Sequence, residues 1–221
     1  MYDYWFTQFD FPDENGKPYR ASGGAMVWNP ELQREIPIGW ECRTLGDLLT
    51  KNSECFDYSS IEPTIDLSVM PSASISLQKL NSSNQFTTNL FIMREGDILF
   101  GSIRPYLKKA GIAPCNGVVA GTVYSYRVKS EHDYNFALFT ICRDSFFDYA
   151  LAVSTGTKMP VVSSDSILSY KIPYSRNVVA QFNQINILQI ICNNVREANS
   201  LSSFRDWLLP MLMNGQATIS D

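Results

Sequence analysis

Residues 178–209 read VVAQFNQINILQIICNNVREANSLSSFRDWLL, a stretch that contains no glycine and no proline. Apolar residues recur along it at intervals of three and four, the spacing that places side chains on one face of an α-helix. The pattern predicts one helix of about 30 residues, roughly 45 Å long, that ends or kinks at Pro210. The predicted apolar stripe consists of Ile185, Leu188, Ile191, Val195, Ala198, Leu201, Phe204 and Leu208.

So long an amphipathic helix needs a surface that covers its apolar face. A second helix could cover it, as in a coiled coil, and this is the interpretation that we favour. The alternative is that the helix folds back onto its own domain. We assign residues 176–213 to this helix and residues 214–221, which begin with an Asn-Gly turn, to a C-terminal tail.

The middle of the chain, residues 41–175, carries mainly strand signals. Residues 92–101 contain two apolar runs with a turn between them at Glu95 and Gly96, and residues 117–128 are rich in β-branched and aromatic residues, as a half-buried strand requires. Apolar residues at helical spacing predict a short helix within residues 135–152. The polar residues 68–85 predict an extended loop. The expected fold class is therefore α+β: one mixed, strand-rich domain followed by one long helix.

Residues 1–40 have the composition of an ordered arm rather than of a core element. Six aromatic residues fall within the first eleven positions, and turn-forming residues follow at 12–18 and 22–24. An aromatic cluster of this size is not stable in water, so we expect the arm to dock on the domain that follows.

Length and composition exclude several classes of protein. A chain of 221 residues with 45% hydrophobic and 18% charged residues can bury a full core, and no apolar run reaches the roughly 18 residues that a transmembrane helix requires. The N-terminus has no signal-peptide pattern, so we expect a soluble, cytoplasmic protein. Five widely spread cysteines without a Cys-x-x-Cys pair predict buried thiols rather than disulfides or a zinc site.

The sequence motifs of common enzymes are absent. No Gly-rich dinucleotide or phosphate-binding motif occurs, and the single histidine, His132, excludes a multi-histidine metal centre. A hydrolase would have to use His132 with a nearby serine, but the polar residues around it favour a surface loop. We therefore expect no catalytic residue, no metal ligand and no bound cofactor, which leaves a binding module.

The charge distribution leaves nucleic acid open as a partner. The whole chain has 18 basic and 22 acidic residues, a net charge of −4. Residues 94–129 nevertheless hold six basic against two acidic residues, a local charge of +4, whereas residues 1–50 hold four against eight. One segment could therefore face phosphate, although an ordinary surface with uneven charge fits these numbers equally well.

Several longer stretches resemble the specificity subunit of type I restriction-modification systems. They are YDYWFTQFDFPDENGKPY at 2–19, IPIGWE at 36–41, GDILFGSIRPYLKKA at 96–110 and STGTKMP at 154–160, and the ending FRDWLLPMLMNGQ at 204–216 is similar to the C-terminus of that family. Together these stretches bracket nearly the whole chain.

The resemblance implies a DNA-recognition subunit of half the usual length. A full subunit of this family has two target recognition domains, each followed by a long helix, and the two helices pack antiparallel. This chain has one of each and begins where a second half would begin, so we expect a natural half-subunit or a fragment. It would read one half of a bipartite target in double-stranded DNA and pair through its helix with a second copy or with another specificity half. An orphan half-subunit that pairs with an intact specificity subunit is the alternative.

The resemblance also implies partners that carry the chemistry. Methyl transfer and cleavage would belong to separate modification and restriction subunits, which would bind S-adenosylmethionine, ATP and Mg²⁺. Within this chain, we expect phosphate contacts from two segments and base contacts from the loop 68–85, with Tyr58. Arg104 could instead hold its loop by pairing with a carboxylate, and the second segment could be a tight structural turn. The expected contacts are Arg104, Tyr106, Lys108 and Lys109 in the first segment and Thr155, Gly156, Thr157 and Lys158 in the second.

Overall fold

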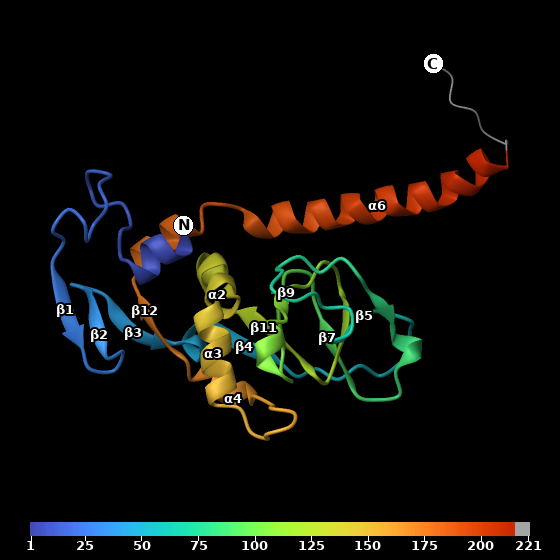
Figure 1. Ribbon diagram of the computed structural model, residues 1–221, viewed down its shortest axis with the longest axis horizontal. Helices are drawn as coiled ribbons and strands as arrows, with labels where there is room; N and C mark the ends of the chain where they lie inside the picture. Colours follow the sequence, from blue (N-terminus) through green and yellow to red (C-terminus); the bar gives the residue numbers. More distant parts are fainter. Residues whose placement is uncertain (215–221) are drawn as a thin grey trace, which may run out of the picture.

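The computed structural model describes residues 1–214, so the expected tail at 214–221 lies outside the described residues except for Asn214. It shows a strand-rich domain with helices at its centre and one long helix, α6, that runs along one side and extends past it (Figure 1). The expected α+β class and the long C-terminal helix are confirmed. No helix among the described residues is both long and apolar enough to cross a membrane.

The strands form two four-stranded sheets and two two-stranded sheets, with the strand orders β6-β5-β10-β7, β4-β11-β8-β9, β1-β2 and β12-β3. All pairs are antiparallel except β5 with β10. The bounds are β1 Met26–Asn29, β2 Arg34–Pro37, β3 Glu41–Thr44, β4 Leu49–Asn52, β5 Pro63–Ile65, β6 Asn81–Ser82, β7 Leu90–Met93, β8 Ile98–Gly101, β9 Ala110–Ile112, β10 Gly117–Ala120, β11 Val123–Val128 and β12 Lys171–Tyr174.

The chain passes from one four-stranded sheet to the other at two turns. The predicted turn at Glu95 and Gly96 is present, but β7 before it and β8 after it pair with different neighbours. The prediction of one strand over 117–128 is wrong, because the chain turns at Gly121 and Thr122 and passes from β10 in one sheet to β11 in the other. A run of apolar residues does not reveal such a turn, since both strands are largely buried.

The N-terminal arm docks as expected and supplies part of the main core. Phe6, Phe9 and Phe11 are buried there, and the ring of Phe6 lies 4.6 Å from that of Phe136, measured between centroids. Residues 1–40 therefore contribute to the core as well as covering it. Phenylalanine burial at roughly 1.5–3 kcal/mol per side chain makes this arm a substantial part of the domain's stability.

The helix predicted within 135–152 is two helices. The chain breaks at Cys142 and Arg143, where Arg143 adopts an extended backbone and its guanidinium pairs with Asp3 of the arm. Short helices form several of the remaining connections between strands. The helices are α1 Leu45–Leu48, α2 Tyr134–Ile141, α3 Asp144–Ala152, α4 Ser164–Leu168, α5 Arg176–Phe182 and α6 Ile187–Met213, with a π-helical turn at Asp3–Thr7 and 3-10 turns at Ser83–Gln85, Pro105–Leu107 and Glu131–Asp133.

The long helix begins later than predicted and continues past Pro210. It begins at Ile187 rather than at residue 178, because residues 183–186 interrupt it and the preceding residues form the separate helix α5. Pro210 does not end the helix, which continues for three residues to Met213. A proline cannot donate to the carbonyl four residues before it, so Pro210 removes one hydrogen bond near the end of the helix without terminating it. Ile185, expected on the apolar stripe, lies in the break and is exposed.

Candidate nucleic-acid interface

The two segments that were expected to contact phosphate lie side by side. The backbone N of Arg104 donates to the carbonyl O of Pro160 at 2.7 Å, and Ile103 forms a β-bridge with Val161. Val161 in turn exchanges two backbone hydrogen bonds of 2.9 Å with Thr155. We call residues 103–108 and 154–161 together the paired-loop surface. Its two strips are 46 or more positions apart in the sequence, so the fold assembles it.

The first strip is a turn with an unusual backbone. Arg104 and Lys108, on either side of the 3-10 turn Pro105–Leu107, both have a φ of +52°, in the left-handed region that non-glycine residues avoid. Such residues cost about 1–3 kcal/mol each and gather where a ligand is held. The turn presents Tyr106, whose side chain is 50% exposed.

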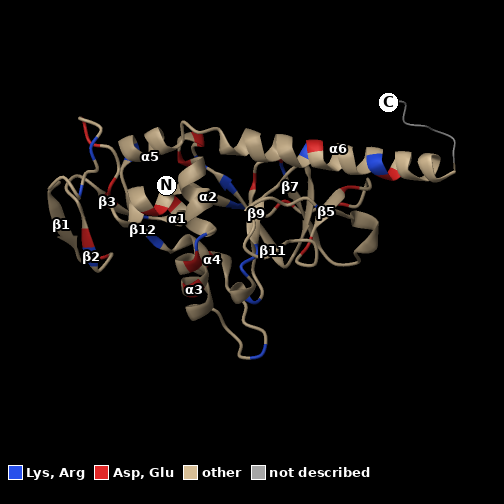
Figure 2. Cartoon of the chain, turned by 45° about the horizontal axis from the view of Figure 1, so that its top comes forward, with Lys and Arg blue, Asp and Glu red and all other residues tan. Residues whose placement is uncertain are grey.

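The second strip projects from the domain between α3 and α4, on the side away from α6 in both views (Figures 1 and 2). Residues 155–159 are all exposed. Gly156 has a φ of +94°, and a Cβ there would lie only 3.1 Å from the carbonyl O of Met159, so glycine is required for this turn. The strip therefore carries hydroxyls and one cation, Lys158, on an exposed and tightly turned loop.

The cations of residues 94–129 do not form one free positive face, and Figure 2 shows basic residues spread over the chain. Lys108 pairs with Asp144 at 2.7 Å, and the Nζ of Lys109 donates to the carbonyl O of Leu67. In contrast, the side chains of Arg104 and Lys158 make no hydrogen bond or ion pair with any residue of 1–214. The expected alternative of a carboxylate partner for Arg104 is therefore not found in this part of the chain.

The loop expected to read bases borders this surface. Residues 68–80 lack helix and strand, as predicted, and β6 and the turn Ser83–Gln85 follow. The backbone N of Ala73 donates to the carbonyl O of Lys108 at 2.8 Å, which joins the loop to the paired-loop surface. Tyr58 is exposed, and its hydroxyl donates to the carbonyl O of Thr88. Tyr58 is thus tied to another segment rather than to the loop.

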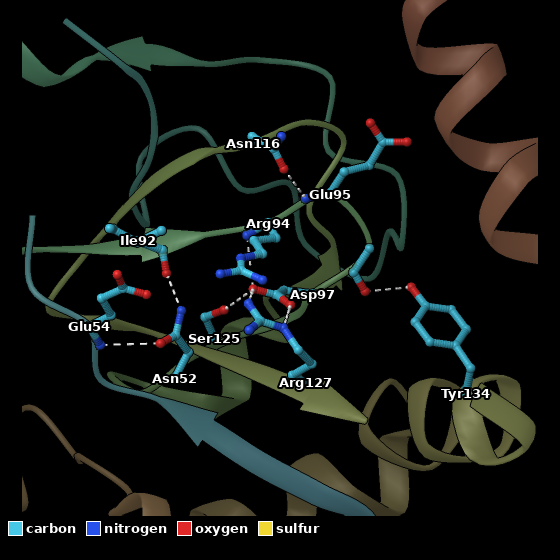
Figure 3. A network of polar contacts seen from close by, with 11 residues as sticks. Asn52, Glu54, Ile92, Arg94, Glu95, Asp97, Asn116, Ser125, Arg127 and Tyr134 are labelled. Carbon is cyan, nitrogen blue, oxygen red and sulfur yellow. Dashed lines mark hydrogen bonds and ion pairs between the residues drawn. The ribbon is translucent and has the colours of Figure 1, made fainter. Parts of the chain in front are cut away.

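The sequence alone did not reveal a buried carboxylate beneath β11. Asp97, which is 3% exposed, accepts two hydrogen bonds from the guanidinium of Arg127, one from the Oγ of Ser125 and one from the backbone N of Arg94 (Figure 3). The hydrogen bonds between its guanidinium and Asp97 raise the pKa of Arg127. Nothing in the spacing of the three side chains marks them as partners, because it is the antiparallel pairing of β8 with β11 that brings Asp97 beside Ser125 and Arg127.

The histidine and the cysteines do not form a catalytic or metal site within residues 1–214. His132 is exposed, and its imidazole makes no hydrogen bond to a serine or a carboxylate of residues 1–214. All five cysteines are free, as expected, but the prediction of buried thiols is confirmed only for Cys192. Cys42, Cys115 and Cys142 are half-buried, and Cys55 is exposed. The described residues hold no group of three metal-ligating side chains.

Helix α6 divides into two halves with different surroundings. Its first half lies against the domain, where Cys192 and Val195 are buried, whereas Leu201 and Phe204 in its second half are 61% and 57% exposed. Phe204 lies nine residues after Val195, which is about 2.5 turns at 3.6 residues per turn, so the two side chains point to opposite sides of the helix. Packing on its own domain is thus observed for the first half of the helix, and pairing with a second helix stays a prediction for the exposed second half. The single apolar stripe expected from the sequence is wrong, because Val195 and Phe204 lie on opposite sides of the helix.

Known proteins provide a context for this arrangement. No protein-family model matches the chain. It is 22% identical over 236 aligned residues to the type I restriction enzyme MjaIX specificity subunit of Methanocaldococcus jannaschii, an alignment that covers 100% of this chain and 52% of the relative.

Solved structures extend the similarity to the fold. The HsdS subunit from Thermoanaerobacter tengcongensis aligns with a TM-score of 0.54 at 22% identity, over 84% of this chain and 50% of that chain. A chain from a study of complex assembly and conformational transition of the type I R-M system aligns with a TM-score of 0.56 at 22% identity, over 83% and 50%. This chain spans about half the length of these relatives. Its fold is that of half an HsdS subunit, and its sequence resembles a type I specificity subunit over its entire length.

Proposed function

We propose that the chain is a non-catalytic DNA-recognition subunit of a type I restriction-modification system and that it reads one half of a bipartite target. The observation that carries this proposal is the similarity of the whole chain, domain and helix together, to half of a specificity subunit. A single recognition domain followed by a single helix is the unit that would serve one half-site.

The paired-loop surface supplies the DNA contacts in this proposal. Arg104 and Lys158 contact phosphates, because neither cation has a partner within residues 1–214 that would have to be displaced. Thr155 and Thr157 add hydroxyl donors, and Tyr106 packs against the sugar-phosphate backbone. The adjoining loop at 68–80 then reads base edges with its serine and glutamine side chains. Lys108 and Lys109 remain candidate contacts, with part of their hydrogen-bonding capacity used inside the chain.

The second half of α6 provides the pairing surface. The exposed apolar face around Leu201 and Phe204 points away from the direction in which Val195 packs, so a partner helix can lie along it without displacing the recognition domain. Two copies related by a twofold axis would present identical recognition domains. The predicted target is therefore an inverted repeat with a spacer that is not read.

The chemistry belongs to partner subunits in this proposal. A modification subunit transfers the methyl group from S-adenosylmethionine, and a restriction subunit uses ATP and Mg²⁺ to cleave. The role of this chain is to hold those subunits at the target sequence.

Selection of bound DNA from a randomised duplex library tests the recognition step directly. The purified chain is expected to enrich one short half-site, alone or as an inverted repeat. Enrichment of no sequence, from a chain shown to be folded by circular dichroism, would contradict the proposal. The orphan alternative makes a different prediction: mixed with an intact specificity subunit, the chain would form a heterodimer.

A further inference from the structure

The break between α5 and α6 is held by the side chain of one buried residue, Asn135 in α2. Its Nδ2 donates to the carbonyl O of Ile185 at 2.7 Å and to that of Phe182 at 3.4 Å. Its backbone N donates to the Oδ1 of Asn183 at 3.0 Å, and the Nδ2 of Asn183 donates to the carbonyl O of Glu131 at 2.8 Å. A broken helix leaves carbonyls without helical partners, and Asn135 donates to two of them, although the carbonyl O of Ile185 also accepts from the backbone N of Ile187 at 2.8 Å. We call this set of four hydrogen bonds the amide clamp.

Beyond the break, α6 has a second anchor on the turn between β7 and β8. The side chain of Leu188 lies over Gly96, where an added Cβ would be 3.2 Å from it, and Arg196 pairs with Glu95. Glu95 in turn is held through its backbone N by the Oδ1 of Asn116 at 3.0 Å (Figure 3). The turn therefore supports the helix through Leu188 and Arg196, and Cys192 and Val195 are buried between these two positions.

Between these two anchors the contact is not filled. A cavity of about 710 Å³ lies between the helix and the domain, lined on one side by Arg94 and Arg127 and on the other by Gln184 and Leu188. Close packing does not fix the helix at this first turn, whereas Cys192 and Val195 are buried against the domain further along. The angle at which the helix leaves the domain therefore depends on the amide clamp together with these later contacts.

We propose that Asn135 is a positioning residue whose amide clamp sets the angle between the recognition domain and α6, and thereby the spacing of the two half-sites that a pair of chains can span. The inference rests on the proposed function for its consequence on DNA, but not for its consequence on the helix. Over the 27 residues of α6, about 40 Å, a tilt of 10° at the clamp displaces the far end by about 7 Å, the rise of roughly two base pairs. A small change at the clamp therefore becomes a change of spacer length.

Two variants and a matched control test the clamp. Asn135→Asp replaces the donating amide by a carboxylate that faces two carbonyls. Asn183→Ala removes the side chain that accepts from the backbone N of Asn135. Asn183 is only half-buried, so the domain is expected to tolerate this substitution better than one at the buried Asn135. The control, Asn52→Asp, makes the same chemical change where an asparagine Nδ2 donates to the carbonyl O of Ile92 inside the domain. It leaves the junction intact.

The direct measurement is the distance between spin labels on the full-length chain. Ketone-bearing amino acids at Asp148 in α3 and Ser203 in α6, both exposed, avoid the five cysteines, and dilution with unlabelled chain suppresses distances between copies. Wild type and Asn52→Asp are expected to give one narrow distribution of the distance between the two labels. In Asn135→Asp and Asn183→Ala this distribution is expected to become broad or to shift. An unchanged narrow distance in Asn183→Ala would overturn the proposal, also where Asn135→Asp fails to fold.

Binding to a series of inverted repeats with different spacers then separates the two levels of the inference. Clamp variants that keep the half-site preference and accept a wider range of spacers support the positioning role on DNA. Clamp variants that retain the wild-type spacer preference despite a broadened distance overturn it. If wild type binds no DNA while the distances still broaden, the clamp stands and the proposed function fails.

Discussion

Arg127 holds Asp97 through two parallel hydrogen bonds, from Nε to Oδ1 and from Nη2 to Oδ2, each 2.9 Å long. The carboxylate also accepts from the backbone N of Arg94 and so closes the turn that supports α6. One ion pair therefore stabilises both the sheet β4-β11-β8-β9 and the turn at Glu95 and Gly96 on which α6 packs.

Replacing Arg127 by alanine is expected to destabilise the domain by roughly 2–3 kcal/mol. The loss of a buried pair typically costs about 3–5 kcal/mol because an uncompensated charge remains, and the 40% exposure of the Arg127 side chain reduces that figure through solvent screening. Urea unfolding followed by circular dichroism measures the change. Arg205→Ala, which removes an exposed pair with Asp206, is the control and is expected to cost less than about 0.5 kcal/mol. Equal effects of both variants would contradict this view of Asp97.

The stability of the fold is expected to fall as the pH rises above about 9. Burial raises the pKa of Tyr2 from 10.0 to about 12, with its hydrogen bond to Thr140 opposing the shift, and burial raises the pKa of Cys142 from 9.0 to about 12. The folded state thus keeps these groups neutral after the unfolded state has released its protons. This stability is fully present below about pH 9 and is lost as the pH rises toward 12.

The free energy of unfolding, measured in urea at intervals from pH 8 to pH 11.5, checks this dependence. Tyr2→Phe keeps the ring but cannot ionise, so its stability is expected to fall less steeply above pH 10 than that of wild type. Parallel curves for the two proteins would show that Tyr2 does not contribute.

The paired-loop surface is expected to contribute electrostatic rather than sequence-specific affinity through its cations. Arg104→Ala and Lys158→Ala should each weaken binding to all DNA sequences alike and reduce the slope of log K against log salt by about 0.9, the value for one phosphate contact. Fluorescence anisotropy at several salt concentrations gives both quantities. Lys17→Ala, on an exposed turn of the arm, is the matched control. Unchanged slopes for Arg104→Ala and Lys158→Ala would place the DNA elsewhere.

Pairing through α6 is expected to fail when its distal apolar face carries charge. Leu201→Glu with Phe204→Glu removes two side chains worth about 1.5–3 kcal/mol each when buried, so association should weaken by about 100-fold or more. Asn199→Glu, on the opposite side of the same helix, should leave the association constant unchanged. Sedimentation equilibrium distinguishes the two results, and a dimer that survives the double substitution would contradict pairing through this face.

The sequence was informative wherever the signal is local. The helical spacing after residue 187, the turn at Glu95 and Gly96, and the loop at 68–80 are each determined by neighbouring residues. The break at 183–186 was missed, because residues 178–191 keep helical spacing and the hydrogen bonds from Asn135, about 50 positions earlier, are tertiary. A local signal was present in Asn186, whose side chain accepts from the backbone N of Gln189 and caps α6.

In the candidate site, too, the local features were predictable from the sequence and the tertiary contacts were not. Both strips of the paired-loop surface were recognisable from strings that resemble a family, but their contact through Arg104 and Pro160 is a tertiary bridge. Which cations are already engaged also depends on the fold: Lys108 and Lys109 stand beside Arg104 in the sequence, yet only Arg104 lacks a side-chain partner within the described part of the chain.

In the proposed function, this chain directs DNA modification to a sequence that it reads. Co-expression with its cognate modification subunit in a host free of DNA methylation, followed by mapping of methylated bases across the host genome, tests it most directly. Methylation is expected within one bipartite motif, an inverted repeat separated by a spacer of fixed length. An absence of sequence-directed methylation, with both proteins soluble and associated, would contradict it.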